Sequence, residues 1–226
     1  MSAPTPVLPK TPMCCPGPSG IAHSDHSGLC PRLDRDKAVV VLCQKGLKLG
    51  QGVAARLRAD GFRAEYLSGG MYGWRDQPGA LRIPMAALPP QVDGTSLWVT
   101  RHRPRVDRIA CPWLLRRFVD ARVQVLFVAP DAVIGVADRF GAIPFDVPGA
   151  EWSHRGDQCT FDTVLDRFEL HCPALDTMAR VIRAADTGAH DLAPQAAGLL
   201  ALSVGLSRQY RDDLAQLEAG MTLYDA

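Results

Sequence analysis

The chain lacks the features that would place it in a membrane or send it through one. Its 226 residues contain no apolar run that approaches the length of a transmembrane helix. The N-terminus has no signal-peptide pattern, because residues 1–10 are rich in proline and hold no apolar segment. These absences predict a cytoplasmic protein without a membrane partner.

The chain also has little net charge. The formal net charge is +1 at pH 7, so overall electrostatics favour neither nucleic acid nor anionic lipid. We find no clear helix-turn-helix pattern either, and direct DNA binding is the weakest of the functions considered. It stays open because arginines cluster between residues 101 and 108.

The number of cysteines, seven, is odd. In a reducing compartment such residues indicate free thiols, metal ligands or nucleophiles rather than a disulfide framework. The length allows one large domain or two small ones.

Composition and periodicity divide the chain into four segments. Residues 1–36 are rich in Pro, Ser and Gly and predict an irregular or disordered leader. Residues 37–78 have an α/β pattern, residues 79–95 are rich in Pro and Gly like a linker, and residues 96–226 form a second folded unit.

The first folded unit alternates strands and helices. A short apolar run at 37–42 predicts a buried parallel strand. A glycine-bearing loop at 43–50 and a helix at 51–60 follow, and 62–67 is a second strand before a short helix at 71–75. The order is that of an α/β unit.

The second folded unit has strands early and helices late, which predicts an α+β domain with a helical C-terminal half. The predicted strands are 96–100, 124–129 and 142–146. The predicted helices are 106–119, 131–140, 161–169, 173–186, 193–206 and 208–219.

Cys43 stands between a buried strand and a turn into a helix. Backbone N–H groups and the helix dipole converge at such a position and lower the pKa of a thiol. Lys45 and Lys48 add positive charge nearby. The pattern predicts a thiolate nucleophile that attacks sulfur donors.

This arrangement resembles the rhodanese (sulfurtransferase) family. The resemblance rests on the strand before Cys43, the loop 43–48, the helix after it and the pattern Gly61-Phe-x-x-x-Tyr-Leu-x-Gly-Gly-Met-x-Gly-Trp74. It covers about residues 37–78, and the strand and helix that precede the cysteine in that family are replaced by the leader. The resemblance implies sulfurtransferase or thiol redox activity at Cys43 in a partial rhodanese-like unit.

The run from Ser153 to Asp162 brings three types of metal ligand together, with His154, Cys159 and Asp162 within nine residues. A mixed nitrogen, sulfur and oxygen set at a loop-to-helix junction suits a divalent transition metal. Each residue also has a structural alternative: His154 in a buried polar network, Cys159 in the core and Asp162 as a helix cap.

More distant ligands for the same site are Asp107, Cys111 and Asp186. Asp107 and Cys111 are four residues apart on a predicted helix and share one face, although Asp107 could instead cap that helix. A site that uses thiolate and imidazole would suit zinc, whereas carboxylates with imidazole would suit iron or manganese.

Arginines crowd the start of the helix predicted at 106–119. Arg101, Arg105 and Arg108, with Arg103, lie beside N-terminal helix N–H groups and form a candidate cradle for chromate, sulfate or phosphate. The alternative is a solvated basic surface paired with nearby carboxylates.

Several blocks of the second unit are similar to the C-terminal domain of the bacterial chromate-resistance family ChrB, over about residues 97–226. The blocks are the stretch from Thr100 to Phe118, Gly141–Gly149, the motif from Ser153 to Asp162, Arg183–Asp186 and Asp191–Gly198. The resemblance implies a role in chromate resistance, with a regulatory or sensing function.

Three functions are therefore open. The first is a chromate-resistance protein that binds a metal or an oxyanion as a sensor or accessory factor. The second is a sulfurtransferase or thiol redox enzyme that uses Cys43, and the third is a DNA-binding regulator. A homodimer is an additional possibility, because an incomplete first unit would expose a sheet edge.

Overall fold

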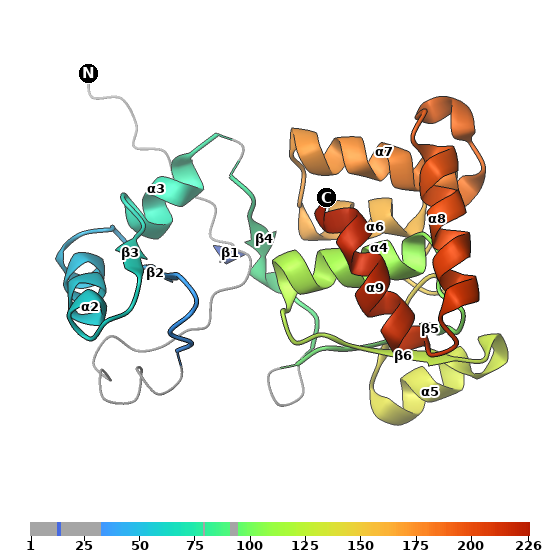
Figure 1. Ribbon diagram of the computed structural model, residues 1–226, viewed down its shortest axis with the longest axis horizontal. Coiled ribbons are helices and arrows are strands. Elements are labelled where there is room, and N and C mark those ends of the chain that lie inside the picture. Colours follow the sequence, from blue (N-terminus) through green and yellow to red (C-terminus); the bar gives the residue numbers. More distant parts are fainter. Residues whose placement is uncertain (1–12, 15–32, 79, 91–94) are drawn as a thin grey trace, which may run out of the picture. The chain divides into compact units, whose positions relative to one another are not determined.

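A computed structural model describes residues 13–14, 33–78, 80–90 and 95–226 (Figure 1). Most of the predicted leader therefore lies outside the described residues. The described chain forms two compact units that meet in sequence between Ala80 and Leu81. Both mix strands and helices, and most of the helices lie in the C-terminal half. No described helix is both long enough and apolar enough to cross a membrane.

The smaller unit has the strand, helix, strand, helix order that its sequence predicts. Strand β2 (Val39–Val41) is followed by α2 (Lys48–Ala59), β3 (Ala64–Tyr66) and α3 (Gly70–Asp76), and β2 pairs with β3 in parallel. Leu57, Phe62 and Ala64 form its small core. The strand before Cys43 is parallel as predicted but not buried, since Val40 is 58% exposed and its two neighbours in β2 are half-buried. Helix α2 starts three residues before the predicted start, inside the segment predicted as loop.

The segment predicted as a linker is partly structured. It contains β4 (Ile83–Pro84), which pairs antiparallel with β1 (Met13–Cys14), and the 3₁₀ turn η2 (Met85–Ala87). The side chain of Ile83 is fully buried in the core of the larger unit. This part of the chain therefore packs with the C-terminal unit. Burial of the Ile83 side chain removes apolar surface from water, which a solvent-exposed linker would not do.

The larger unit is built on a three-stranded parallel sheet in the order β6-β5-β7. The strands are β5 (Leu97–Arg101), β6 (Gln124–Val128) and β7 (Ile143–Pro144). Neighbouring residues of β5 face opposite sides: Trp98 packs in the main core and Val99 packs against α5 (Val133–Phe140). The 3₁₀ turn η4 (Pro130–Ala132) leads into α5.

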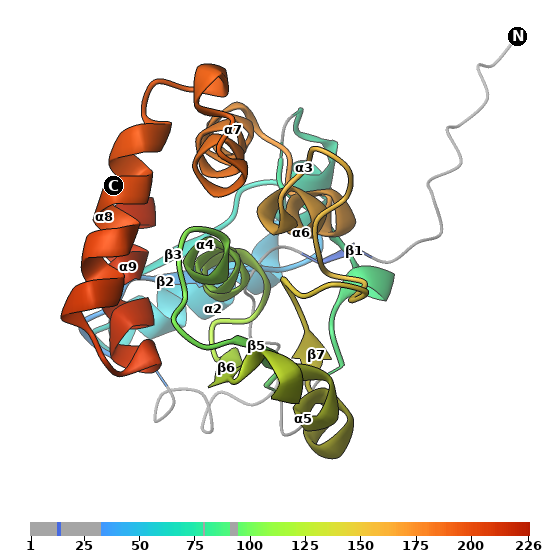
Figure 2. The ribbon, with the colours of Figure 1, turned by 90° about the vertical axis from the view of Figure 1, so that its right-hand side faces the viewer.

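Helix α4 (Asp107–Leu114) covers the Trp98 face and runs through the centre of the unit. Figure 2 shows α4 between the sheet and the C-terminal helices, and α6, α7 and α9 all contact it. The helix predicted at 106–119 is confirmed as one continuous element, but its second half, η3 (Leu115–Val119), is π-helical. Because α4 connects β5 to β6 on one face and α5 connects β6 to β7 on the other, the sheet is doubly wound. The prediction of an α+β domain is therefore corrected for this half of the unit, where parallel strands alternate with helices.

The helical C-terminal half is confirmed. It consists of α6 (Thr160–Phe168), α7 (Pro173–Thr187), the 3₁₀ turn η5 (His190–Leu192), α8 (Ala196–Gln209) and α9 (Asp213–Asp225). The last two helices start later than predicted. Helix α9 begins at Asp213 because the side chain of Asp212 accepts a hydrogen bond from Ala215 N and caps the first turn.

Candidate metal centre

A cluster of acidic side chains lies at the carboxyl ends of β5 and β7. Asp107 is the first residue of α4, which follows β5, and Asp146 follows β7 by two residues. In parallel sheets whose connections cover opposite faces, ligands bind in the crevice where the strand order reverses. Here that crevice is between β5 and β7, so topology alone favours a binding site at this edge.

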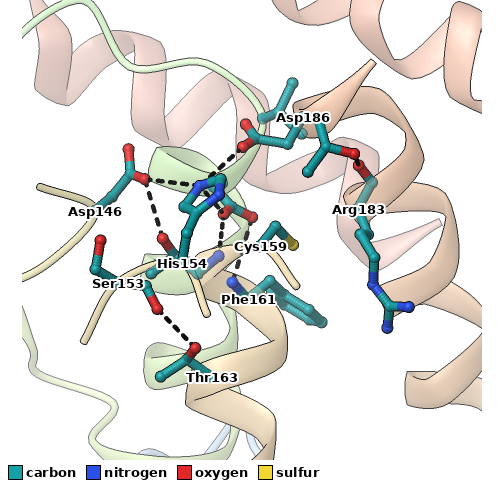
Figure 3. A network of polar contacts seen from close by, with 12 residues as sticks. Asp146, Ser153, His154, Cys159, Phe161, Thr163, Arg183 and Asp186 are labelled. Atoms are coloured by element: carbon teal, nitrogen blue, oxygen red, sulfur yellow. Dashed lines mark hydrogen bonds and ion pairs between the residues drawn. The ribbon is translucent and has the colours of Figure 1, made fainter. Parts of the chain in front are cut away.

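His154 is the point on which these carboxylates converge. Its Nε2 atom lies 3.2 Å from Asp186 Oδ2, 3.3 Å from Asp146 Oδ1 and 3.6 Å from Asp107 Oδ2. Figure 3 shows His154 between Asp146 and Asp186, which approach from the β7 edge and from α7. Oxygen atoms from three elements thus surround one imidazole nitrogen.

Asp107, Asp146 and His154 form the compact part of this set. Their potential ligand atoms all lie within 4.8 Å of one another. Asp186 is outside that compact set, although its Oδ2 is close to His154 Nε2. Ligand atoms at these separations are near enough for one ion to contact all of them after small side-chain shifts.

The loop that carries His154 is held by α6. Thr163 donates a hydrogen bond from Oγ1 to Ser153 O at 2.7 Å (Figure 3). Arg155 Nε donates to Thr163 Oγ1 at 3.0 Å. Arg155 and Gln158 exchange backbone hydrogen bonds across a tight turn. The imidazole therefore projects from an anchored turn.

The first residues of α6 also hold the two carboxylates. Thr160 N donates to Asp107 Oδ2 at 2.6 Å, and Thr160 Oγ1 donates to Asp146 Oδ1 at 3.0 Å. Asp107 was open to interpretation as a cap of its own helix; its side chain instead accepts N–H groups at the start of α6. The positive end of the α6 dipole favours the negative charge there.

The pKa values of the three acidic groups shift in different directions. Burial raises the pKa of Asp107 well above its usual value, and the charges of Asp186 and Asp146 add to that rise. Burial likewise raises the pKa of Asp186. Burial also opposes ionisation of Asp146, but its hydrogen bond with His154 and the charge of Arg101 outweigh that effect and lower its pKa. The hydrogen bond to Asp146 raises the pKa of His154 to about 9.

Two of the three arginines predicted to bind an oxyanion contact the cluster. Arg101 Nη2 lies 2.9 Å and Arg108 Nε 3.2 Å from Asp146 Oδ2. The Arg105 side chain is exposed and forms no ion pair with the described residues. Arg103 turns toward α8, where its Nη1 donates to Tyr210 O at 2.8 Å. Arg101 and Arg108 are thus the predicted pair that the fold brings to the site.

Asp162 has a structural environment. Its carboxylate accepts Cys159 N at 2.9 Å in a capping box at the start of α6. Arg183 binds the same carboxylate through two hydrogen bonds of 2.8 and 2.6 Å. Among the described residues Asp162 is not in the compact ligand set, so the structure favours the capping alternative over the ligand prediction.

The two predicted thiol ligands are buried in the main core. Burial raises the pKa of Cys159 and of Cys111 well above the usual value, and the charge of Asp107 raises both further. Neither sulfur belongs to the compact ligand set of the described residues. These positions favour the core alternative, because a thiol ligates a metal as the thiolate.

Backbone strain concentrates at this site. Four described residues other than glycine have a positive φ, and three of them, Arg103, Val106 and Asp146, flank or belong to the cluster. Val106 has φ 40°, which is costly for a β-branched residue. Strain of this kind persists where the surrounding structure enforces it, and it is typical of functional sites.

Asp146 is the site residue that sequence reasoning did not single out. It appeared only as the last residue of a predicted strand and within a similar block. The signal available was positional: a carboxylate directly after a strand of a parallel sheet, at the edge where ligands bind.

Cys43 belongs to the smaller unit, whereas this cluster belongs to the larger one. Its Sγ accepts a hydrogen bond from Gly46 N at 3.2 Å. Burial would raise the pKa of the thiol, but backbone hydrogen bonds from the loop, led by Gly50 and Gly46, outweigh burial and lower it. Gly70 packs so closely that a Cβ there would lie 2.2 Å from Cys43 O. The environment is the one predicted for a nucleophilic thiolate.

The fold and the cluster define a doubly wound α/β unit with a carboxylate–histidine site at the reversal point of its sheet. The family model described as the ChrB C-terminal domain matches residues 98–226, more than half of the chain. The chain therefore belongs to the ChrB family, and the predicted domain position, about 97–226, is confirmed.

One curated relative extends this similarity. The chain is 30% identical over 187 residues to Protein ChrB of Cupriavidus metallidurans (strain CH34), and the match covers 75% of this chain and 55% of that protein. The chain thus spans about half the length of the curated relative that it matches. No solved structure matches the chain.

Proposed function

We propose that this chain is a chromate-resistance protein that binds a divalent metal ion in its C-terminal unit and acts as a sensor or accessory factor. Its membership of the ChrB family supports the first part. The second part rests chiefly on the convergence of Asp107, Asp146 and Asp186 on His154 Nε2 at 3.2–3.6 Å. The cytoplasmic location stays a prediction.

Manganese or iron(II) is the proposed metal. The candidate ligands are carboxylate oxygens and one imidazole nitrogen, a set that suits these ions. Zinc sites more often include thiolates, and Cys111 and Cys159 lie in the core with raised pKa values. The site would also need little reorganisation, because α6 already fixes Asp107 and Asp146.

An anion is the proposed second ligand of the site. With a divalent ion bound and His154 neutral, three carboxylates face the ion and the guanidiniums of Arg101 and Arg108, so positive charge exceeds negative charge by one. An oxyanion such as chromate or sulfate would restore the balance. The Arg101 side chain is 37% exposed and that of His154 is 39% exposed, which gives an anion access from solvent.

The test is metal content and calorimetric titration with Mn²⁺, Fe²⁺ under anaerobic conditions, and Zn²⁺. His154→Ala should abolish binding of the preferred ion. His171→Ala is the matched control, because His171 also contacts two carboxylates, Asp166 at 3.1 Å and Asp176 at 2.8 Å, but at a more exposed site. Equal binding by wild type and His154→Ala, or no binding by wild type after reconstitution, would refute the metal proposal.

Sulfur transfer at Cys43 is the second candidate function, and the hydrogen bond from Gly46 N to Cys43 Sγ favours it. In this reaction the thiolate takes the outer sulfur of thiosulfate and releases sulfite, and cyanide then removes that sulfur as thiocyanate. The described part of the smaller unit has a two-stranded sheet, which has fewer strands than the full sheet of the rhodanese family. Thiocyanate production by wild type and Cys172→Ser but not by Cys43→Ser would support it.

A further inference from the structure

The loop Arg103–Val106 precedes Asp107 and holds an unfavourable backbone conformation. Arg103 has φ 57° and Val106 has φ 40°. Such conformations are unfavourable in free energy, so they persist only where contacts from the surrounding structure stabilise them. Asp107 is the next residue, so the conformation of this loop sets the position of its carboxylate.

The contacts that hold the loop come from the last two helices. Ser203 Oγ of α8 accepts Val106 N at 2.9 Å, and Tyr224 of α9 donates its hydroxyl to Val106 O at 3.1 Å. Gln216 of α9 donates to Pro104 O, and Asp213 Oδ1 accepts Arg103 N at 3.1 Å. Each contact joins residues about a hundred positions apart, and each is made to the backbone of the loop.

One face of α9 lies against α4 and the loop before it. Gln216, Gly220 and Tyr224 are spaced by four residues and share a face. At Gly220 a Cβ would lie 2.9 Å from the Ile109 side chain, so glycine permits the close approach of α9 to α4. That approach brings the Tyr224 hydroxyl to Val106 O, which also accepts Ala110 N in the first turn of α4.

We propose that Ser203 and Tyr224 are positioning residues for the metal centre. They hold Val106 in its strained conformation and thereby fix Asp107 opposite His154 and Asp146. This inference rests on the proposed function, since it assigns a role toward the metal that site binds. Filling the core does not require these two hydroxyls, because a phenyl ring and a methyl group would occupy nearly the same space; loss of the Ser203 hydroxyl also removes the acceptor of Val106 N, which lowers stability by itself.

The test uses Tyr224→Phe and Ser203→Ala, with Thr222→Val as control. Thr222 is also on α9, and among the described residues its hydroxyl bonds only within that helix, to Ala219 O at 2.8 Å. We would measure Mn²⁺ affinity by calorimetry, the visible absorption spectrum of the Co²⁺-loaded protein, and the thermal midpoint. The Co²⁺ spectrum reports coordination geometry, which a change in overall stability does not move.

We expect each of the two variants to bind Mn²⁺ about tenfold more weakly, as is typical for residues that support metal ligands. Their Co²⁺ spectra should differ from that of the wild type, whereas Thr222→Val should match it. If the wild type binds Mn²⁺ and both variants keep its affinity and spectrum, the inference is wrong and the proposed function stands. A wild type that binds no metal overturns both. If one of the two variants fails to fold, the Mn²⁺ affinity and Co²⁺ spectrum of the other variant test the inference.

Discussion

Two regions of this protein carry candidate functional side chains: the Cys43 loop and the carboxylate–histidine cluster. They differ in the sequence separation of the contacts that hold them, which is short in the Cys43 loop and long in the cluster. Cys43 lies between parallel strand β2 and α2, and Asp107 of the cluster lies at the start of α4, after parallel strand β5. The Cys43 thiol interacts with backbone groups two to seven residues further on. The cluster joins side chains from positions 107, 146, 154 and 186, and the contacts that orient it reach position 224.

This difference teaches what each region depends on. A loop whose contacts are local keeps its chemistry as long as its own backbone keeps its shape. A cluster assembled from three separate segments, α4, the connection between β7 and α6, and α7, depends on the packing of the whole larger unit. Variants that separate local from long-range support should therefore affect the two regions differently.

The largest expected effect is on metal binding at the cluster. Asp107→Asn replaces a buried carboxylate by a neutral amide of the same shape, and we expect Mn²⁺ affinity to fall by more than about a hundredfold, beyond the range seen for supporting residues. Calorimetric titration measures it. Binding within a factor of about three of the wild type would show that Asp107 is not a ligand.

The next effect is on stability. Asp146→Asn keeps a side chain that tolerates positive φ but removes the partner of Arg101, Arg108 and His154. We expect a loss of about 2–3 kcal/mol in the free energy of unfolding, because the largely buried Arg108 is left without this partner. Arg101 and His154 are more than a third exposed, so water compensates part of their loss. Denaturant titration of the metal-free protein gives the value.

Asp225→Asn is the matched control for that experiment. Asp225 also has a guanidinium partner, Arg117, but its side chain is 40% exposed whereas that of Asp146 is 6% exposed. An exposed pair contributes about 0–1 kcal/mol. Equal losses in the free energy of unfolding for Asp146→Asn and Asp225→Asn would mean that burial does not strengthen the ion pairs of Asp146.

In the smaller unit, Gly70→Ala should act on the Cys43 loop alone. Gly70 has φ 59°, and its new Cβ would collide with Cys43 O at 2.2 Å, so we expect a cost of about 2 kcal/mol and a displaced loop. Gly52→Ala in α2 meets nothing within 4 Å and should instead stabilise by up to about 1 kcal/mol. Thermal denaturation and the alkylation rate of Cys43 measure both; loss of Mn²⁺ binding in Gly70→Ala would contradict the separation of the two regions.

Asp162→Asn tests a residue that the sequence placed in the metal site and the structure places in a helix cap. Loss of the capping carboxylate and of the Arg183 pair should cost about 1 kcal/mol of stability. Mn²⁺ affinity should change little. A decrease comparable to that of Asp107→Asn would restore Asp162 as a ligand.

The smallest effect is the pH dependence of Cys43 reactivity. Because the pKa of the Cys43 thiol is lowered, alkylation should persist at a pH where an ordinary thiol is protonated, and it should fall as the pH drops through the lowered pKa. The rate measured against pH in the Cys172→Ser background gives the midpoint. A midpoint at or above that of a free cysteine would remove the case for a thiolate.

Local patterns made much of the fold predictable. The order of strands and helices around Cys43 and the long helical half follow from periodicity, and these were confirmed. The apolar run before Cys43 forms a parallel strand as predicted, but it is not buried. Helix ends were less accurate because capping contacts decide them, as Asp212 does for α9. Burial of Ile83 within a segment rich in Pro and Gly was not predictable, since composition does not show which surface a side chain will meet.

The candidate site was predictable in part. His154, Asp107 and Asp186 were predicted as ligands and come together, and Arg101 and Arg108 reach the same place. Cys159 and Asp162 were chosen because they are near His154 in sequence. Proximity in the chain is a poor guide at the start of a helix, where side chains radiate in different directions and those that cap the helix turn back toward it.

By itself, the sequence determined the family, the local chemistry around Cys43 and the residue types available for a metal centre, because these depend on short segments. Only the tertiary structure decided that Asp146 lies beside Asp107 and His154, that Asp162 caps α6 and pairs with Arg183, and that α8 and α9 contact the loop before Asp107. The physical reason is the length scale. Hydrogen bonds and ion pairs act over a few ångströms, and the fold alone brings residues a hundred positions apart to that distance.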